Sequence, residues 1–313
     1  MHIRFWGVRG SLPSALLPYI IREKISAVLE YVMPEDVANN ESKGRFLDGL
    51  PPWLCETVGG NTPCISVNIE GMEETFIFDC GSGMRELGSV CVSEYPMPSN
   101  FHVFFSHFHW DHLQGLPFFY PIYNKSVIVN FYSPKKNLEE IIGGQMNPPY
   151  FPVQLEQTAS QKMYHELKGP VSVGPVSVAF RRMNHPGDSY SYMVAHNGKR
   201  FIYATDTELS ALDFSKTDEN ISFFENADMI VLDAQYTLGE AIEKYNWGHS
   251  SFSLSVDFAA SWGIKHLVLF HFDPAYDDRK IHGMLQSARW YLQRMNLKGM
   301  QISLATEGLE FLL

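Results

Sequence analysis

The sequence predicts a mixed α/β protein, built as a four-layer αβ/βα sandwich with a site along one edge of its sheets. Three observations predict this fold. Short apolar runs typical of buried strands recur in both halves of the chain. Segments with helical periodicity follow each strand-rich half and can cover a sheet. Several strands end in histidine or aspartate, which would bring these side chains together at one edge.

Size and composition limit the class of protein. The 313 residues suffice for one large domain or two ordinary ones, and 45% of them are hydrophobic. No clear linker divides the chain, so we expect a single domain over 1–313 with a helical insertion at about 14–57. No apolar run has the length of a membrane span, and the first residues resemble a strand more than a signal peptide. The four cysteines lack CxxC spacing, which favours a cytoplasmic protein with reduced thiols.

Charge limits the partners. The formal net charge is −11, and no run of lysine or arginine occurs. Proteins that hold long nucleic acids neutralise many phosphates with basic groups. We therefore expect no long nucleic acid and no membrane as a partner, and a small anionic substrate is compatible with the composition.

The strands follow from apolar runs bounded by turn residues. Segment 143–152 begins with two glycines and ends in a stretch rich in proline. We therefore expect an irregular loop there, which either gates the site or packs on the surface. Helices are expected from about 84 and over about 137–142, 251–262 and 277–295. Strands are expected at about 3–8, 64–69, 75–79, 101–105, 126–132, 176–183, 190–195, 200–204, 229–232, 266–270, 301–305 and 309–313.

The insertion contains one predicted helix, over about 20–33, with Pro34 as its stop. Its apolar residues recur with helical spacing. We expect this stripe to pack into the core, and a lid over the site or a contact in a homodimer is the alternative. The stripe consists of Ile21, Ile25, Val28, Leu29 and Val32.

Four residues that can bind metal lie within six positions, directly after the predicted strand at 101–105: His107, His109, Asp111 and His112. Because side chains alternate along a strand, His107 and His109 leave its end in the same direction. The spacing suits two divalent ions, with the two histidines on the first and Asp111 and His112 on the second. Imidazole and carboxylate together favour Zn²⁺, with Mn²⁺ or Fe²⁺ possible.

This HxHxDH pattern after an apolar strand resembles the signature of the metallo-β-lactamase fold superfamily. The resemblance implies that fold, a dinuclear site and three further ligands in chain order, His185, Asp206 and His271. The first ion would be held by His107, His109 and His185. The second would be held by Asp111, His112 and His271, with Asp206 between the two ions. Asp79, at a strand end before glycines, either forms a turn or holds a metal-bound histidine in orientation.

Further segments resemble the branch of that superfamily that contains class II cyclic-nucleotide phosphodiesterases, PhnP-like phosphodiesterases and tRNase Z. In that branch, a histidine of a Gly-His-Ser segment, oriented by an upstream acid, protonates the leaving oxygen. His249 and Asp233 match this pair, although tRNase Z has the longer Glu at the acid position. The implied catalytic residues are thus Asp111, His249 and Asp233. The segments are Phe5–Ser11, Gly59–Thr62, Asp79–Gly83, Thr205–Glu208 and Trp247–Ser250.

These patterns predict a dinuclear metal-dependent hydrolase, a phosphodiesterase for a small phosphodiester such as a cyclic nucleotide, a cyclic phosphate or a phosphorylcholine ester. The last candidate rests on aromatic residues able to form a cation–π cage, Trp53, Tyr150, Phe151 and Trp247. The alternatives are a thioester or lactam hydrolase of the same fold, which would not need the His249–Asp233 pair, and a tRNA 3′-processing endonuclease, which would need a basic surface. A non-catalytic module stabilised by metal is the remaining alternative.

Overall fold

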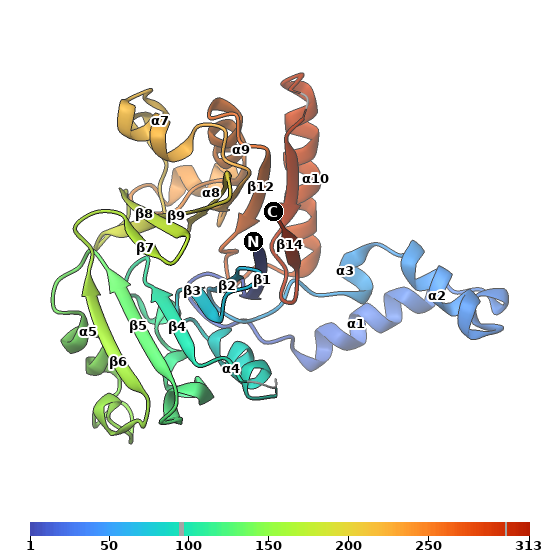
Figure 1. The fold of residues 1–313 in the computed structure, drawn as a ribbon. Coiled ribbons are helices and arrows are strands. Elements are labelled where there is room, and N and C mark those ends of the chain that lie inside the picture. Colours follow the sequence, from blue (N-terminus) through green and yellow to red (C-terminus); the bar gives the residue numbers. More distant parts are fainter. Residues whose placement is uncertain (94–96, 298) are drawn as a thin grey trace.

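Two mixed seven-stranded sheets enclose the main hydrophobic core of this computed structural model, which describes residues 1–93, 97–297 and 299–313 (Figure 1). The first sheet has the order β14-β1-β2-β3-β4-β5-β6, in which β3 to β6 run parallel. Alternation sends Phe104 of β4 into the core between the sheets and Val103 to the opposite face. Its strands are β1 (His2–Gly7), β2 (Cys64–Asn68), β3 (Glu74–Phe78), β4 (Asn100–Phe104), β5 (Ile128–Ser133), β6 (Gln161–Glu166) and β14 (Glu310–Leu312).

The second sheet has the order β13-β12-β11-β10-β9-β8-β7, and β10 to β13 run parallel. Apart from ionisable residues at their ends, the parallel strands β10, β11 and β12 are apolar, as strands buried on both faces should be. Its strands are β7 (Val171–Val173), β8 (Val176–Met183), β9 (Ser189–His196), β10 (Lys199–Ala204), β11 (Met229–Asp233), β12 (His266–Phe270) and β13 (Gln301–Leu304).

Helices form the outer layers. A second core joins the first sheet to α4 and α5, and α9 and α10 pack on the second sheet, which confirms the predicted four-layer sandwich. No helix in the described ranges has both the length and the apolar character of a membrane span. The helices are α1 (Pro18–Leu29), α2 (Asn40–Gly49), α3 (Pro52–Cys55), α4 (Met84–Ser93), α5 (Leu138–Gln145), α6 (Ala211–Phe214), α7 (Asp218–Phe224), α8 (Leu238–Glu243), α9 (Phe252–Ser261) and α10 (Asp278–Arg294).

Every predicted strand occurs within two residues of its expected bounds, but other predictions were wrong or incomplete. The helix expected over 20–33 is α1, which ends at Leu29. Its stripe does not pack into the core: Ile21, Ile25 and Leu29 are exposed, and Val28 and Val32 are half-buried. The irregular loop expected over 143–152 begins inside α5, which continues to Gln145. The sequence did not predict β6 and β7, whose mixed polarity lacks a clear period, or the short helices α2, α3, α6, α7 and α8.

The fold brings the carboxyl ends of five parallel strands, β3, β4, β10, β11 and β12, to one shared edge. Three residues that follow these strands have left-handed backbones, with φ of 60° at Asp79, 44° at Asp206 and 64° at His271. Such φ values are costly for residues other than glycine and concentrate at functional sites. Here they turn the chain sharply out of each strand, so that the side chains gather at the edge.

Candidate metal centre

The first group of potential ligands comes from the end of β4 and the turn before β9. The distance is 2.9 Å between His107 Nε2 and His109 Nδ1, and 3.3 Å between His185 Nε2 and His109 Nδ1. Ligand atoms around one tetrahedral Zn²⁺ lie about 3.3 Å apart, given bonds of about 2.0 Å. His107 and His185 are buried, and His109 is exposed at the mouth of the site. These three imidazoles therefore converge as the ligands of one ion would.

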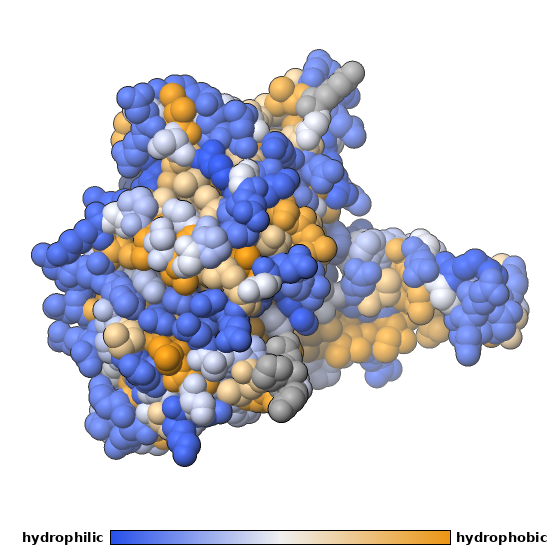
Figure 2. Space-filling view, viewed as in Figure 1, coloured by the Kyte–Doolittle hydropathy of each residue, from blue (hydrophilic) through white to orange (hydrophobic). Residues whose placement is uncertain are grey.

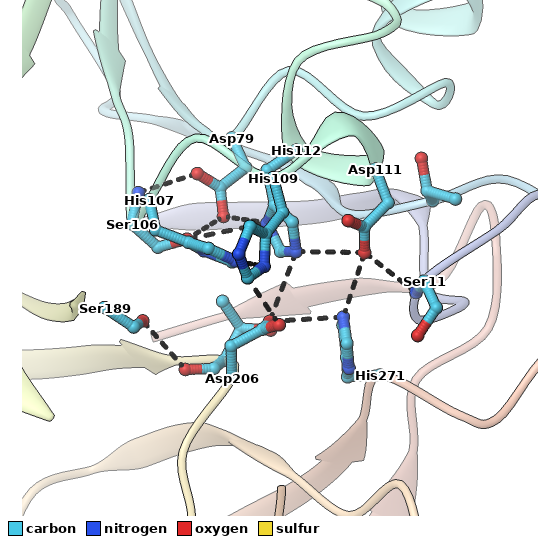
Figure 3. Close-up of polar contacts among 12 residues, drawn as sticks. Ser11, Asp79, Ser106, His107, His109, Asp111, His112, Ser189, Asp206 and His271 are labelled. Carbon is cyan, nitrogen blue, oxygen red and sulfur yellow. Dashed lines mark hydrogen bonds and ion pairs between the residues drawn. The ribbon is translucent and has the colours of Figure 1, made fainter. Parts of the chain in front are cut away.

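The second group lies beside the first. A short 3₁₀ helix, Trp110–His112, presents Asp111 and His112 to Asp206 and His271 from the other sheet (Figure 3). His112 Nε2 is 3.2 Å from Asp111 Oδ2 and 3.2 Å from Asp206 Oδ1. His271 Nε2 is 3.1 Å from the same Asp206 oxygen and 3.4 Å from Asp111 Oδ2. All four residues are buried, and their ligand atoms again share one small volume.

Asp206 lies between the two groups. While its Oδ1 faces His112 and His271, its Oδ2 is 3.6 Å from His107 Nε2 and 3.8 Å from His185 Nε2. One carboxylate oxygen thus points to each group. This is the geometry expected of a carboxylate that bridges two ions, the position implied by the family resemblance.

The charges of the site fit a pair of cations. Burial lowers the pKa of His107 and of His185, which leaves their nitrogens free of the extra proton. Burial opposes ionisation of Asp206, but His271, His112 and His107 together hold its pKa well below the usual range. Ligands must be in these deprotonated forms to bind metal. His112 differs: burial lowers its pKa, but Asp111, Asp206 and Asp79 together raise it well above the usual range, because three carboxylates lie around one buried imidazole.

Asp79 has the contacts of a residue that orients a ligand. Its Oδ2 accepts hydrogen bonds from His112 Nδ1 at 2.8 Å, Ser106 Oγ at 2.6 Å and the Tyr203 hydroxyl at 2.7 Å. Its Oδ1 accepts the backbone N–H of Ser106 at 2.7 Å. With Nδ1 engaged in this way, Nε2 of His112 is directed to the other ligands. The structure therefore gives Asp79 the environment of the orienting role and not that of a simple turn former.

Three outer contacts were missed from the sequence. Gln235 Oε1 accepts from His271 Nδ1 at 3.2 Å, the Gly248 carbonyl accepts from His185 Nδ1 at 2.8 Å, and the Ser11 N–H donates to Asp111 Oδ2 at 2.8 Å. The first two contacts engage Nδ1 and so leave Nε2 of His271 and of His185 to face the centre, while the third holds the Asp111 oxygen that faces His112 and His271. Gln235 follows Asp233 by two residues at the end of β11, and this position at a strand end is the signal that could have found it.

The predicted pair His249 and Asp233 is formed. His249 Nδ1 donates to Asp233 Oδ2 at 2.7 Å, and the fully buried Asp233 also accepts the backbone N–H groups of Thr207 and Gln235. Burial opposes charge on His249, but Asp233 outweighs burial and raises the pKa of His249. The His249 ring centroid lies 5.1 Å from those of both His185 and His271. His249 therefore stands over the junction of the two ligand groups.

Glu208 holds the segment that carries His249, and sequence reasoning gave it no role. Its Oε1 accepts the N–H of Asn246 and its Oε2 the N–H of Gly248, each at 3.0 Å. The Gly248 carbonyl in turn accepts from His185. Gly248 has φ of +88°, and a Cβ there would lie 2.3 Å from His185 Nδ1, so glycine is required at this approach. Glu208 thus ties the Asp206 loop to the His249 segment.

The four aromatic residues of the suggested cation–π cage have different surroundings. Arg279 lies over the Trp53 ring, Phe151 packs edge-on against Phe118, and Tyr150 is exposed. Trp247 is also exposed, with Lys244 Nζ 5.7 Å from its ring centroid. These contacts do not form one cage, so they give no support to a phosphorylcholine ester over the other small diesters.

Comparison with known sequences places these residues in a wider context. A family described as a beta-lactamase superfamily domain matches residues 74–272, which include all the potential ligands. Ribonuclease Z from Trichodesmium erythraeum is 29% identical over 97 residues, covering 30% of this chain and 28% of that protein. Ribonuclease Z from Haloarcula marismortui is 23% identical over 270 residues, covering 70% of this chain and 83% of that protein.

Solved structures share the architecture. The metallo-beta-lactamase fold protein YhfI from Bacillus subtilis superposes with a TM-score of 0.64 at 14% identity, covering 99% of this chain and 98% of that one. A diphosphatase from the PhnP family gives a TM-score of 0.61 at 16% identity, covering 100% of this chain and 97% of that one. At such low identities the likeness establishes a common fold and leaves the substrate open.

Proposed function

The chain belongs to the beta-lactamase superfamily, and from that membership we propose that it is a dinuclear metal-dependent phosphodiesterase acting on a small phosphodiester. The family match and the ribonuclease Z relatives support a metal-dependent hydrolase, and the phosphodiester is the substrate class that we propose for it. One observation carries that choice, namely the His249–Asp233 pair beside two converging ligand groups. A thioester or lactam hydrolase of this fold does not need such a pair.

The proposed ligand assignment follows the two groups. His107, His109 and His185 would hold one ion, while Asp111, His112 and His271 would hold the other, with Asp206 shared. When bound, two divalent ions, Zn²⁺ by preference and Mn²⁺ or Fe²⁺ otherwise, would activate water and neutralise charge on the phosphate. Asp79, Gln235 and the Gly248 carbonyl keep the ligand nitrogens aimed at the centre.

The protein's own chemical step would be a proton transfer. His249 uses Nδ1 for the bond to Asp233, which leaves Nε2 as the nitrogen that can serve the substrate. An alkoxide is a poor leaving group, so a proton given by His249 as the P–O bond breaks would speed the reaction. Asp233 fixes the ring and stabilises the protonated form, and it is itself fixed by three backbone N–H groups.

A tRNA 3′-processing endonuclease is the second candidate, since both relatives named above are ribonucleases Z. The net charge of −11 without a basic run still favours a small substrate, because a long nucleic acid is held mainly through its phosphates. A cytoplasmic location and a single domain with an insertion at 14–57 remain predictions alongside the function.

A substrate panel tests the proposal. Purified protein of measured metal content should hydrolyse bis(4-nitrophenyl) phosphate, lose this activity with a chelator and regain it with added metal. It should act poorly on nitrocefin and S-lactoylglutathione. Faster turnover of the lactam or the thioester than of any diester would overturn the proposal, and cleavage of a precursor tRNA in preference to cyclic nucleotides would favour the second candidate.

A further inference from the structure

Residues 14–57, called the arm below, project from the body of the molecule as the helices α1, α2 and α3 (Figure 1). The base of the arm is anchored firmly. Lys24 Nζ lies 2.6 Å from the buried Asp278 carboxylate, and it also donates to the Glu56 carbonyl at 2.7 Å. Neither α1 nor α2 contains a buried residue. The arm is thus attached at one end and open to solvent along its length.

The helix α1 is apolar on two sides. Its inner side, with Ile20, Ala27 and Val28, is half-buried next to α3. Its outer side carries the outer stripe, and Figure 2 shows apolar surface along this part of the arm. An apolar stripe on a helix normally faces a core or another helix. The outer stripe comprises Leu17, Ile21, Ile25 and Leu29, which are 47%, 44%, 56% and 64% exposed.

We propose that the outer stripe is the interface of a homodimer, in which α1 of one copy packs antiparallel against α1 of a second copy. The residues recur every four positions, so the stripe is complementary to itself under a two-fold axis. Leu17 of one copy then lies opposite Leu29 of the other, and Ile21 lies opposite Ile25. The i, i+4 ridges of two such helices interdigitate in the commonest class of helix packing.

The available area is adequate for a stable dimer. Exposed apolar residues also flank the outer stripe in sequence, namely Leu16, Tyr19, Tyr31 and Met33, which are 39%, 58%, 59% and 57% exposed. Together with the stripe they present on the order of 800 Å² per copy, the area that a standard interface buries on each partner. A lone helix of α1's 12 residues is marginal in water, so packing on a second copy would also stabilise the arm.

Other occupants fit less well. A lid over the chain's own metal centre would have to fold back, but α1 and α2 point away from the body (Figure 1). An anionic membrane surface would favour several basic residues beside the stripe. In α1 only Arg22 and Lys24 are basic, and Lys24 is held by Asp278. A second copy needs no such charge, and it supplies a surface of the required shape.

Light scattering on the full-length protein tests the dimer. Wild type should have twice the chain mass of 35.7 kDa at micromolar concentration, and the double variant Ile21→Glu/Ile25→Glu should have the mass of one chain. Leu47→Glu is the matched control, since Leu47 is an exposed apolar residue on α2 outside the stripe; it should remain dimeric. Circular dichroism and metal content should be unchanged in all three. A monomeric wild type, or a double variant that stays dimeric, would refute the interface.

Cross-linking tests the antiparallel register and does not depend on a charge substitution. In a Cys55→Ser background, which removes the exposed thiol, a mixture of Ile21→Cys and Ile25→Cys chains should form a disulfide-linked dimer on mild oxidation. Leu47→Cys chains should form far less. Equal yields for the mixture and for Leu47→Cys would contradict the register. A membrane surface would be the partner instead if the protein floated with anionic vesicles and the dimer disappeared as the vesicle concentration rose; this result would overturn the proposal.

Discussion

At the scale of single residues, the candidate metal centre depends on which nitrogen each histidine directs to it. An imidazole can present either nitrogen, and the choice is set by the partner of the other one. Asp79, Gln235 and the Gly248 carbonyl engage Nδ1 of His112, His271 and His185 respectively. In all three cases Nε2 is left to face the centre. The ligand set and its outer contacts therefore form one hydrogen-bonded unit.

Asp206 is the residue on which the dinuclear assignment depends most. Asp206→Ala removes the only carboxylate with one oxygen directed at each ligand group in the described chain. We expect elemental analysis to fall from two ions per chain to one or fewer. Activity should fall by more than the roughly 10–100-fold that loss of an outer partner costs. An active wild-type sample that holds one ion or fewer would contradict the assignment.

Glu208 supports a second prediction at this scale. Glu208→Gln replaces one acceptor oxygen with an NH₂ group that faces a backbone N–H, so one of the two bonds to the His249 segment is lost. If His249 donates the proton, hydrolysis of a cyclic nucleotide should slow by about 10–100-fold, and that of a nitrophenyl diester much less. Because the Gly248 carbonyl also accepts from His185, metal analysis of the variant is needed to show that the slower hydrolysis does not come from lost metal.

The matched control for Glu208 is Glu219→Gln, the same change at an exposed residue of α7. It should leave both activities and the metal content unaltered. If Glu208→Gln slowed the hydrolysis of both diesters by the same factor at full metal occupancy, Glu208 would not act through His249.

At the scale of elements, strand β4 carries a buried histidine whose titration should be visible in stability. The His102 ring stacks on Phe76, and its Nδ1 forms a hydrogen bond with the Tyr132 hydroxyl. Among the described residues its Nε2 has no hydrogen-bond partner. Burial lowers the pKa of His102 to about 4. As pH falls below about 6.5, the unfolded chain takes up a proton here while the folded chain does not, so stability falls between pH 6.5 and 4.

His102→Gln removes this source of acid sensitivity. The melting temperature of wild type should drop more between pH 7 and pH 5 than that of the variant. The shift in the pKa of His102 limits its contribution to the free energy of unfolding to about 3 kcal/mol. Thermal unfolding followed by circular dichroism at both pH values measures it. If the two proteins lose the same stability on acidification, His102 is not a buried neutral group.

The elements that the sequence predicted well are those with a strong local pattern. Buried strands such as β10, β11 and β12 are apolar runs with clear ends, and the histidine cluster stands directly after β4. Edge strands β6 and β7 carry no such pattern. The α1 stripe was misassigned because periodicity shows that a helix has an apolar side and does not show what covers that side.

The site was predictable only in part for a similar reason. The motif and the family resemblance located the potential ligands, since these lie at strand ends. The contacts of Gln235 and Glu208 join loops that are far apart in sequence, so no local spacing encodes them. The left-handed backbones of Asp79, Asp206 and His271 were equally invisible, because a non-glycine residue adopts them only where the surrounding structure imposes them.

At the scale of the whole molecule, two sheets contribute complementary parts of one site. The first sheet supplies the histidine cluster and Asp79, while the second supplies Asp206, Asp233 and His271 at the ends of neighbouring parallel strands. Because the ligand groups draw on both sheets, their spacing depends on how the sheets pack. The chemistry proposed for the site depends in addition on His249, which stands where the two groups meet.

The dependence of the His249→Ala effect on the leaving group tests the phosphodiesterase account most directly. A nitrophenolate leaves without a proton, whereas an alkoxide needs one. At full metal occupancy, His249→Ala should therefore slow the hydrolysis of a cyclic nucleotide by roughly 10²–10⁴-fold and the hydrolysis of bis(4-nitrophenyl) phosphate far less. Asp233→Asn should show a milder form of this difference. Equal losses on the two substrates would contradict the account, because His249 would then serve the metal centre or the fold and not the leaving group.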